Sequence, residues 1–282
     1  MTDYKQYDIP QGVLVHSYQI PVHGIRKKVI WHFSDIHLSE YDDLSTPEEI
    51  LHAKEIAEGW EQTRRYFAEK YGEPWEPAQR ASALTHLKKL LNLAGTGDAL
   101  IVAGDMSDYI SPANMRYLEE AFQSFPAPWV AVCGNHDPAD QIPNGFLYSR
   151  VKQDVQVLEL EDMVILALDD SQRQVNASQL DALRQLLAGE KPVLIAMHVP
   201  FSTPENKELL IGCGEYFRLD HPQAGAEVEQ FRELIQENAD KIVAVMAGHL
   251  HFGNVSKLVP GVMQYVSSQG ILGNINRYEI GE

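Results

Sequence analysis

Residues 31–39, with the sequence WHFSDIHLS, place a carboxylate and an imidazole two positions apart at the end of an apolar run. Alternate residues of an extended chain point to the same side, so Asp35 and His37 can reach one point just beyond a strand. Such a pair can bind a metal ion, transfer a proton or simply close a loop. Taken alone, the pair does not decide among these roles.

The same arrangement recurs further along the chain. Apolar runs end in GDMSD, GNHD, HVP and GHLH, and in three of these a glycine precedes the polar residue, where it lets the backbone approach a ligand closely. In open α/β sheets, ligands bind beyond the carboxyl ends of the strands. The side chains delivered to such ends are Asp35, His37, Asp105, Asn135, His198, His249 and His251.

Together these residues supply carboxylates, an amide oxygen and imidazoles, and their number decides the kind of site. They are too many for one tetrahedral ion, but they suit two ions that share a carboxylate and keep positions open for water and substrate. Nitrogen and oxygen ligands without thiolates favour Mn²⁺, Fe, Zn²⁺ or Co²⁺ over Ca²⁺ or Cu(I). The sequence therefore predicts two divalent or trivalent metal ions of open identity.

Single members of this set also have structural interpretations. Asp105 could cap the following helix, since Asp is a favoured N-cap, although Ser107 or Ser111 could do so instead. Asn135 could be a turn residue with a left-handed backbone. His249 and His251 are the hardest to explain in this way, because two imidazoles flanking one leucine after a buried strand need partners.

The composition excludes several classes of protein. With 40 acidic and 23 basic residues, the formal charge is -17 and the pI about 5.0, so no binding of nucleic-acid duplexes is expected. Two cysteines, Cys133 and Cys213, are too few for a disulfide framework. No stretch has the roughly 18 apolar residues of a membrane span, and the first residues lack the pattern of a signal peptide. We expect a reduced, cytoplasmic protein.

The elements that must position the polar residues are short apolar strands that alternate with helices. The expected strands that run into polar blocks lie at 99–103, 129–133, 192–197 and 241–247. The expected helices between them lie near 112–123, 176–188 and 223–237. This alternation favours an α/β protein, and additional strands towards both ends indicate a second sheet. We expect a single domain over residues 1–282.

The amino-terminal part is expected to form a β-hairpin. Residues 13–22 and 28–33 have the composition of strands, and His23 and Gly24 lie between them as turn residues.

Residues 39–96 are expected to be a helical excursion from this alternation. The pattern predicts one helix over 47–71 and a second over 77–93. This excursion is larger than the alternation of strands and helices needs. It is expected either to cover the site or to mediate dimer contacts.

The motifs D-x-H, GD-x-x-D, GNHD, a histidine after a strand, and GH-x-H occur in this order from Asp35 to His251, and this series resembles the calcineurin-like metallophosphoesterase family. The resemblance implies a two-sheet β-sandwich flanked by helices, of the α/β (α+β) class, with a metal site at the carboxyl ends of strands. The short GNHD form is similar to the bacterial phosphodiesterase branch. Tyr109 and Asp137 stand where the protein-phosphatase branch has Arg and Glu, which argues against a phosphoprotein substrate.

The resemblance also implies a role for each motif residue. The implied ligands of a first metal are Asp35, His37 and His251. The implied ligands of a second metal are Asn135, His198 and His249. Asp105 would bridge both metals, His136 would face the substrate as a proton donor or phosphoryl stabiliser, and Asp108 would hold His136 by a hydrogen bond.

The implied activity is the metal-dependent hydrolysis of phosphoesters, with phosphodiesters or nucleotide-like small molecules as substrates. Two cations lower the pKa of a water between them, so that a hydroxide can attack phosphorus. His136, whose ordinary pKa is about 6.5, would protonate the departing alkoxide. The alternatives are a phosphomonoesterase of the same fold and a non-catalytic metal-binding scaffold, and the complete ligand set argues against a scaffold. The oligomeric state is open.

Other residues near these motifs have weaker patterns. Asp169 and Asp170 end an apolar strand, where a turn or cap role is favoured over support of a ligand histidine. Residues 201–222 form a long irregular segment after His198, either an ordinary surface excursion or a lid. The candidate substrate contacts in it are Lys207, Tyr216, Phe217 and Arg218. His221 is interpreted as structural, with a contact to the site as the alternative.

Overall fold

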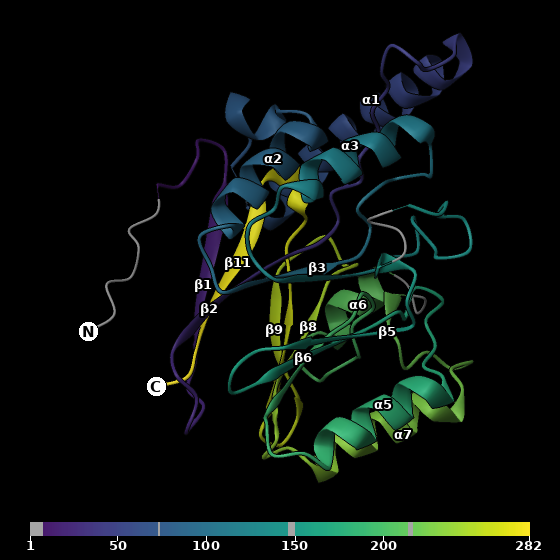
Figure 1. The fold of residues 1–282 in the computed structure, drawn as a ribbon. Helices are drawn as coiled ribbons and strands as arrows, with labels where there is room; N and C mark the ends of the chain where they lie inside the picture. The colour runs from purple at the N-terminus through teal and green to yellow at the C-terminus, as the bar shows by residue number, and fades with distance from the viewer. Residues whose placement is uncertain (1–7, 73, 146–149, 214–216) are drawn as a thin grey trace.

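Two β-sheets lie face to face, and helices cover their outer faces (Figure 1). The computed structural model describes residues 8–72, 74–145, 150–213 and 217–282. In spatial order, the 5-stranded sheet consists of β1 (Leu14–Ile20), β11 (Asn274–Ile280), β2 (Lys28–Phe33), β3 (Ala99–Ala103) and β4 (Trp129–Val132). The 6-stranded sheet consists of β5 (Val155–Glu159), β6 (Val164–Leu168), β7 (Val193–Ala196), β8 (Ile242–Ala247), β10 (Val262–Val266) and β9 (Asn254–Val259). The predicted sandwich flanked by helices is confirmed.

The helices form two groups on opposite sides of the sandwich (Figure 1). The helices of the first half of the chain are α1 (Pro47–Tyr71), α2 (Ala83–Ala94) and α3 (Pro112–Gln123). Those of the second half are α5 (Ala177–Leu187), α6 (Lys207–Cys213) and α7 (Ala226–Glu237). Short 3-10 turns lie at Pro77–Arg80 and Gly270–Leu272. Within the described residues, no helix combines the length and the apolar character needed to cross a membrane.

The alternation of side chains along the strands explains the layers. Because successive residues of a strand point to opposite faces, a strand covered on both faces must be apolar throughout. In β2, Ile30 faces the space between the sheets, where it shares an apolar cluster with Ile165 of the other sheet. Trp31 points the other way and packs in a cluster with Leu90 of α2. A third cluster lies under α5 and α7 on the far side of the second sheet.

The predicted amino-terminal hairpin is wrong. β11 lies between β1 and β2, and it pairs parallel with β1 and antiparallel with β2. Val15 is opposite Ile275, and Ile30 is opposite Tyr278. The turn residues between β1 and β2 are a local signal only, whereas β11 offers continuous pairing to both strands and is itself buried between them.

The helical excursion over residues 39–96 agrees with its prediction in the first helix but not in the second. α1 occupies the predicted range, since Thr46 caps its first turn and accepts a hydrogen bond from the third residue of the helix. The second helix does not begin at Pro77, because Pro77–Arg80 forms only a 3-10 turn and Ser82 caps a separate helix. The guanidinium of Arg64 on α1 donates to the carbonyl of Ala81, which fixes the chain in an extended break before α2.

Candidate metal centre

The polar motifs lie directly beyond the carboxyl ends of neighbouring parallel strands. β2, β3 and β4 are adjacent and parallel in one sheet, and β7 and β8 are adjacent and parallel in the other. The loops after them pack tightly: a Cβ on Gly104 would collide with the ring of His198, and one on Gly134 would collide with the Asp105 carboxylate. Gly104 is therefore required for the loops of the two sheets to meet, and Gly134 is required for the loops after β3 and β4 to meet.

The backbone at the ligand positions is strained in a consistent way. A left-handed conformation is found at five of the predicted ligands, namely Asp35 (φ 56), His37 (φ 47), Asp105 (φ 50), His249 (φ 72) and His251 (φ 57). In L-residues this conformation brings Cβ close to a carbonyl oxygen and costs about 1–2 kcal/mol each. Strain of this kind concentrates at functional sites, where the surrounding structure holds it.

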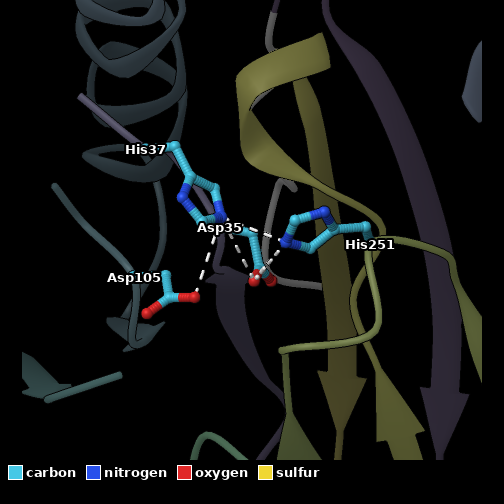
Figure 2. Close-up of side chains that lie close together, drawn as sticks. All are labelled: Asp35, His37, Asp105 and His251. Carbon is cyan, nitrogen blue, oxygen red and sulfur yellow. Dashed lines mark hydrogen bonds and ion pairs between the residues drawn. The ribbon is translucent and has the colours of Figure 1, made fainter. Parts of the chain in front are cut away.

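A first set of donor atoms lies at the ends of β2, β3 and β8. Figure 2 shows the side chains of Asp35, His37, Asp105 and His251 converging, and one ligand atom from each lies within 4.8 Å of the others. The Nε2 atoms of His37 and His251 are 3.0 Å apart, and His251 Nε2 is 3.3 Å from Asp35 Oδ1. Asp105 Oδ2 lies 3.7 Å from His37 Nε2. This arrangement matches the spacing of ligands around one ion.

A second set shares Asp105 with the first. One ligand atom each of Asp105, His198 and His249 lies within 4.8 Å of the others. His198 Nε2 is 3.4 Å from Asp105 Oδ2 and 3.1 Å from His249 Nδ1. Asn135 Oδ1 is 3.2 Å from the same Nε2 atom. Asp105 Oδ2 therefore faces both donor sets, as a carboxylate oxygen between two metal ions must.

The chemistry of these atoms fits bound cations. Two imidazole nitrogens that face each other can share only one proton, and this occurs at both histidine pairs. Asp35 Oδ1 and His249 Nε2 are buried without a hydrogen-bond partner, which costs about 1–3 kcal/mol for each such atom. A cation held between the donors satisfies these lone pairs.

The ionisation of the histidines agrees with this interpretation. Burial lowers the pKa of His37 despite the nearby carboxylates, and it lowers the pKa of His249 to about 3, so both rings are neutral and present lone pairs. Burial also lowers the pKa of His198, but Asp105 and the other carboxylates outweigh it and raise the pKa to about 10. The proton on His198 supplies a positive charge among these carboxylates, and the binding of a metal ion would displace it.

Hydrogen bonds orient the ligand atoms. The second oxygen of Asp35, Oδ2, accepts from the Ser34 hydroxyl and from the backbone N–H of His249, which leaves Oδ1 for a metal. His37 Nδ1 donates to Asp108 Oδ1 at 3.0 Å, and His198 Nδ1 donates to a backbone carbonyl oxygen at 2.7 Å. Since carboxylate and carbonyl oxygens only accept, the Nε2 atom of each ring faces the other donors.

Asp137 is a supporting residue whose role the sequence did not indicate. Its buried carboxylate accepts from the backbone N–H groups of Gly134 (2.6 Å), Asp105 (3.2 Å) and Met106 (2.7 Å). It thereby joins the loop after β3 to the loop after β4. The sequence comparison had marked this position only as a departure from the protein-phosphatase branch.

Asp170 supports the loop after β7 in a similar way. Its two carboxylate oxygens accept from the backbone N–H groups of His198 (2.7 Å) and Val199 (2.8 Å). The favoured turn role was thus incomplete, because Asp170 also holds the backbone of His198, which is a predicted ligand. A buried carboxylate directly after an apolar strand was the available signal.

His136 and Asp108 lie beside the donor sets. His136 Nδ1 is 3.0 Å from the backbone carbonyl oxygen of Asp108 and 3.3 Å from its Oδ1. The Asp108 carboxylate raises the pKa of His136 to about 9 against the opposite effect of burial. Asp108 Oδ1 also accepts from His37 and, at 2.8 Å, from Trp60 Nε1. The expected contact of Asp108 with His136 is present, and its contacts with His37 and Trp60 were not anticipated.

A cavity of about 410 Å³ opens onto the donor sets. The loops after the strands contribute Asp105, Asn135, His136, His249, Leu250 and His251 to its lining. The α1 helix contributes Thr63, Tyr66, Phe67 and Lys70. Residues 39–96 were expected either to cover the site or to mediate dimer contacts, and the structure shows that α1 covers the site.

The segment 201–222 contributes less than its length suggested. Phe217 lines the cavity, and its ring centroid is 5.1 Å from that of His249. Lys207 and Arg218 are absent from the lining, and Tyr216 lies outside the described residues. His221 is buried, with Nε2 3.3 Å from the backbone oxygen of Arg173, which fits a structural role.

Comparison with known proteins agrees with this geometry. Residues 28–253 match the model of the calcineurin-like phosphoesterase family. A probable cyclic nucleotide phosphodiesterase of Psychrobacter arcticus is 28% identical over 128 residues, which are 40% of this chain and 46% of that protein. A second probable cyclic nucleotide phosphodiesterase, from Synechococcus sp., is 27% identical over 163 residues, which are 55% and 58% of the two chains. The match thus spans about half the length of these curated relatives.

A solved structure shares the fold over nearly the whole chain. A dimetal phosphatase from Danio rerio superimposes with a TM-score of 0.55 at 11% identity, and the alignment covers 89% of this chain and 88% of that one. At this identity the similarity concerns the fold alone.

Proposed function

Because the chain belongs to the calcineurin-like phosphoesterase family, we propose that it hydrolyses phosphodiesters or nucleotide-like small molecules with two bound metal ions. The observation that carries the proposal is the position of Asp105 Oδ2 between two sets of donor atoms. The names of the two curated relatives, both probable cyclic nucleotide phosphodiesterases, support a diester substrate.

In this proposal each donor set holds one ion, and Asp105 belongs to both. The other ligands of the first ion are Asp35, His37 and His251. The other ligands of the second ion are Asn135, His198 and His249. When bound, two such cations would lower the pKa of a shared water and neutralise charge on the phosphoryl oxygens. Manganese, iron and zinc all suit these nitrogen and oxygen ligands.

His136 is the proposed proton donor to the departing oxygen. It lines the cavity, and Asp108 holds it through Nδ1, so Nε2 is the atom that can donate towards the substrate. The raised pKa favours the protonated ring, which is the form that can donate. The same positive charge can also stabilise a phosphoryl oxygen, and a general acid of this kind contributes about 10²–10⁴-fold to rates.

The proposal predicts diesterase activity that depends on metal. After removal of metal with a chelator, bis-p-nitrophenyl phosphate and p-nitrophenyl phosphate should both stay intact, and adding Mn²⁺ should restore turnover, faster on the diester. Parallel additions of zinc and iron would rank the metals. Faster turnover of the monoester would instead indicate a phosphomonoesterase. No turnover of either compound, with two ions bound per chain, would indicate the scaffold alternative.

A further inference from the structure

One face of α1 forms a wall of the cavity beside the donor sets. Thr63, Tyr66, Phe67 and Lys70 are spaced by three and four residues, so they lie on one side of the helix, and all of them line the cavity. Trp60 begins the same face, where its indole donates to Asp108 and its ring centroid lies 4.2 Å from that of His37. The helix is thus fixed to the donor sets at one end of this face and borders the substrate space along the rest.

Aromatic rings lie on either side of the H-x-H motif within this cavity. The ring centroid of Phe67 is 5.5 Å from that of His251, and the ring of Phe217 lies 5.1 Å from that of His249. Tyr66 adds a third ring to the lining and is 57% exposed. Pockets lined by aromatic rings with few polar groups take flat apolar parts of ligands.

Lys70 is the sole lysine or arginine among the described residues that line the cavity. Its ammonium lies 5.4 Å from the ring centroid of Tyr66 and 5.3 Å from that of Tyr71, and the described residues form no salt bridge with it. A hydrogen bond with the Tyr66 hydroxyl is the main cause that raises the pKa of Lys70, so it keeps its charge at neutral pH. In a chain with a formal charge of -17, a lysine that pairs with no carboxylate of the described residues is available to an anion.

A structural role for Lys70 accounts for only part of these observations. Lys70 lies in the last turn of α1, where a cation is favoured by the helix dipole. Lys54, on the same helix, likewise lies over an aromatic ring, at 5.4 Å from the centroid of Tyr41, but it does not line the cavity. The helix dipole explains a cation near the helix end, but it does not explain why the cation borders the substrate space.

We propose that Lys70 binds a second anionic group of the substrate, distinct from the phosphoryl group that is cleaved, while Tyr66, Phe67 and Phe217 contact a flat apolar group of the same molecule. This inference rests on the proposed function and narrows its substrate class. The preferred substrate is a phosphodiester that carries an aromatic ring and a further phosphate group. Nucleotide derivatives with two phosphate groups have this chemistry.

Two matched substrates test the proposal. Thymidine 5′-(p-nitrophenyl phosphate) and its 3′-phosphorylated form differ only in the second phosphate. The Mn²⁺-loaded wild-type protein should prefer the 3′-phosphorylated compound in kcat/KM, mainly through KM, by roughly 10- to 100-fold, as expected for a hydrogen bond to a charged group. Lys70→Met should lose this preference, because methionine keeps the length of the side chain but removes the positive charge that would bind the second phosphate.

Lys54→Met and Lys70→Arg are the controls. Both should keep the preference, because the first leaves the cavity unchanged and the second keeps the charge. The inference is overturned if the wild type does not distinguish the two thymidine compounds, or if Lys70→Met distinguishes them as well as the wild type does. Absence of metal-dependent turnover of bis-p-nitrophenyl phosphate in the wild type would instead contradict the proposed function, and with it this inference.

Discussion

Asp105→Asn is expected to abolish metal-dependent turnover. Asp105 Oδ2 faces both donor sets, so the substitution removes a negatively charged ligand from each proposed ion at once. Loss of a residue that merely orients a ligand already costs about 10–100-fold in metal affinity or activity, and a shared ligand should cost more. Turnover of bis-p-nitrophenyl phosphate should therefore fall below detection at Mn²⁺ concentrations that saturate the wild type.

Thermal unfolding with and without Mn²⁺ separates this effect from misfolding. Asparagine has the shape of aspartate and tolerates the left-handed backbone at position 105, so the metal-free variant should fold. A ligand that binds only the native state raises its stability by mass action, so Mn²⁺ should raise the Tm of the wild type more than that of Asp105→Asn. The exposed Asp140 provides the matched control, and Asp140→Asn should behave like the wild type. Equal Tm shifts in the wild type and Asp105→Asn would contradict the shared-ligand role.

His136→Ala is expected to lower turnover by about 10²–10⁴-fold on a diester with a poor leaving group, such as a nucleoside alkoxide. The loss should be much smaller on bis-p-nitrophenyl phosphate, because p-nitrophenolate departs without a proton. This difference distinguishes a proton donor from a residue that only stabilises the phosphoryl group, which would affect both substrates alike. Metal content should stay unchanged, since His136 belongs to neither proposed ligand set.

The pH dependence of the same variant is a second readout. Asp108 raises the pKa of His136 to about 9, whereas bound cations push it back towards its ordinary value of about 6.5. A proton donor with a pKa in this interval makes kcat fall as the pH rises through that pKa. The alkaline decline should be present in the wild type and absent from His136→Ala. If kcat falls at the same pH and by the same factor in both proteins, the group that titrates is not His136.

The clustering of the candidate ligand residues was predictable because the signal for it is local. Each follows an apolar run, and parallel neighbouring strands bring their carboxyl ends to one edge. Seven separate residues of the right chemical type in this position left little room for another interpretation, and the structure brings all of them together. The family and the two-sheet architecture were predictable for the same reason, and both are confirmed.

The features that escaped prediction depend on contacts distant in the sequence. β11 separates β1 from β2 although more than 200 residues lie between it and either strand, and no turn signal near residue 24 reports this. Trp60 contacts Asp108 and His37 because α1 folds back over the site, and helical periodicity cannot indicate where a helix docks. Asp137 was visible in the sequence, but its role as an acceptor for backbone N–H groups of both loops follows only from the meeting of these loops.

The number of metal ions bound per chain tests the two-metal account most directly. Protein stripped with a chelator is titrated with Mn²⁺ while bound metal and turnover of bis-p-nitrophenyl phosphate are measured in the same samples. The account predicts two ions per chain, with turnover that rises as the second ion binds. Full turnover with one ion per chain, or turnover that persists in the stripped protein, would contradict it.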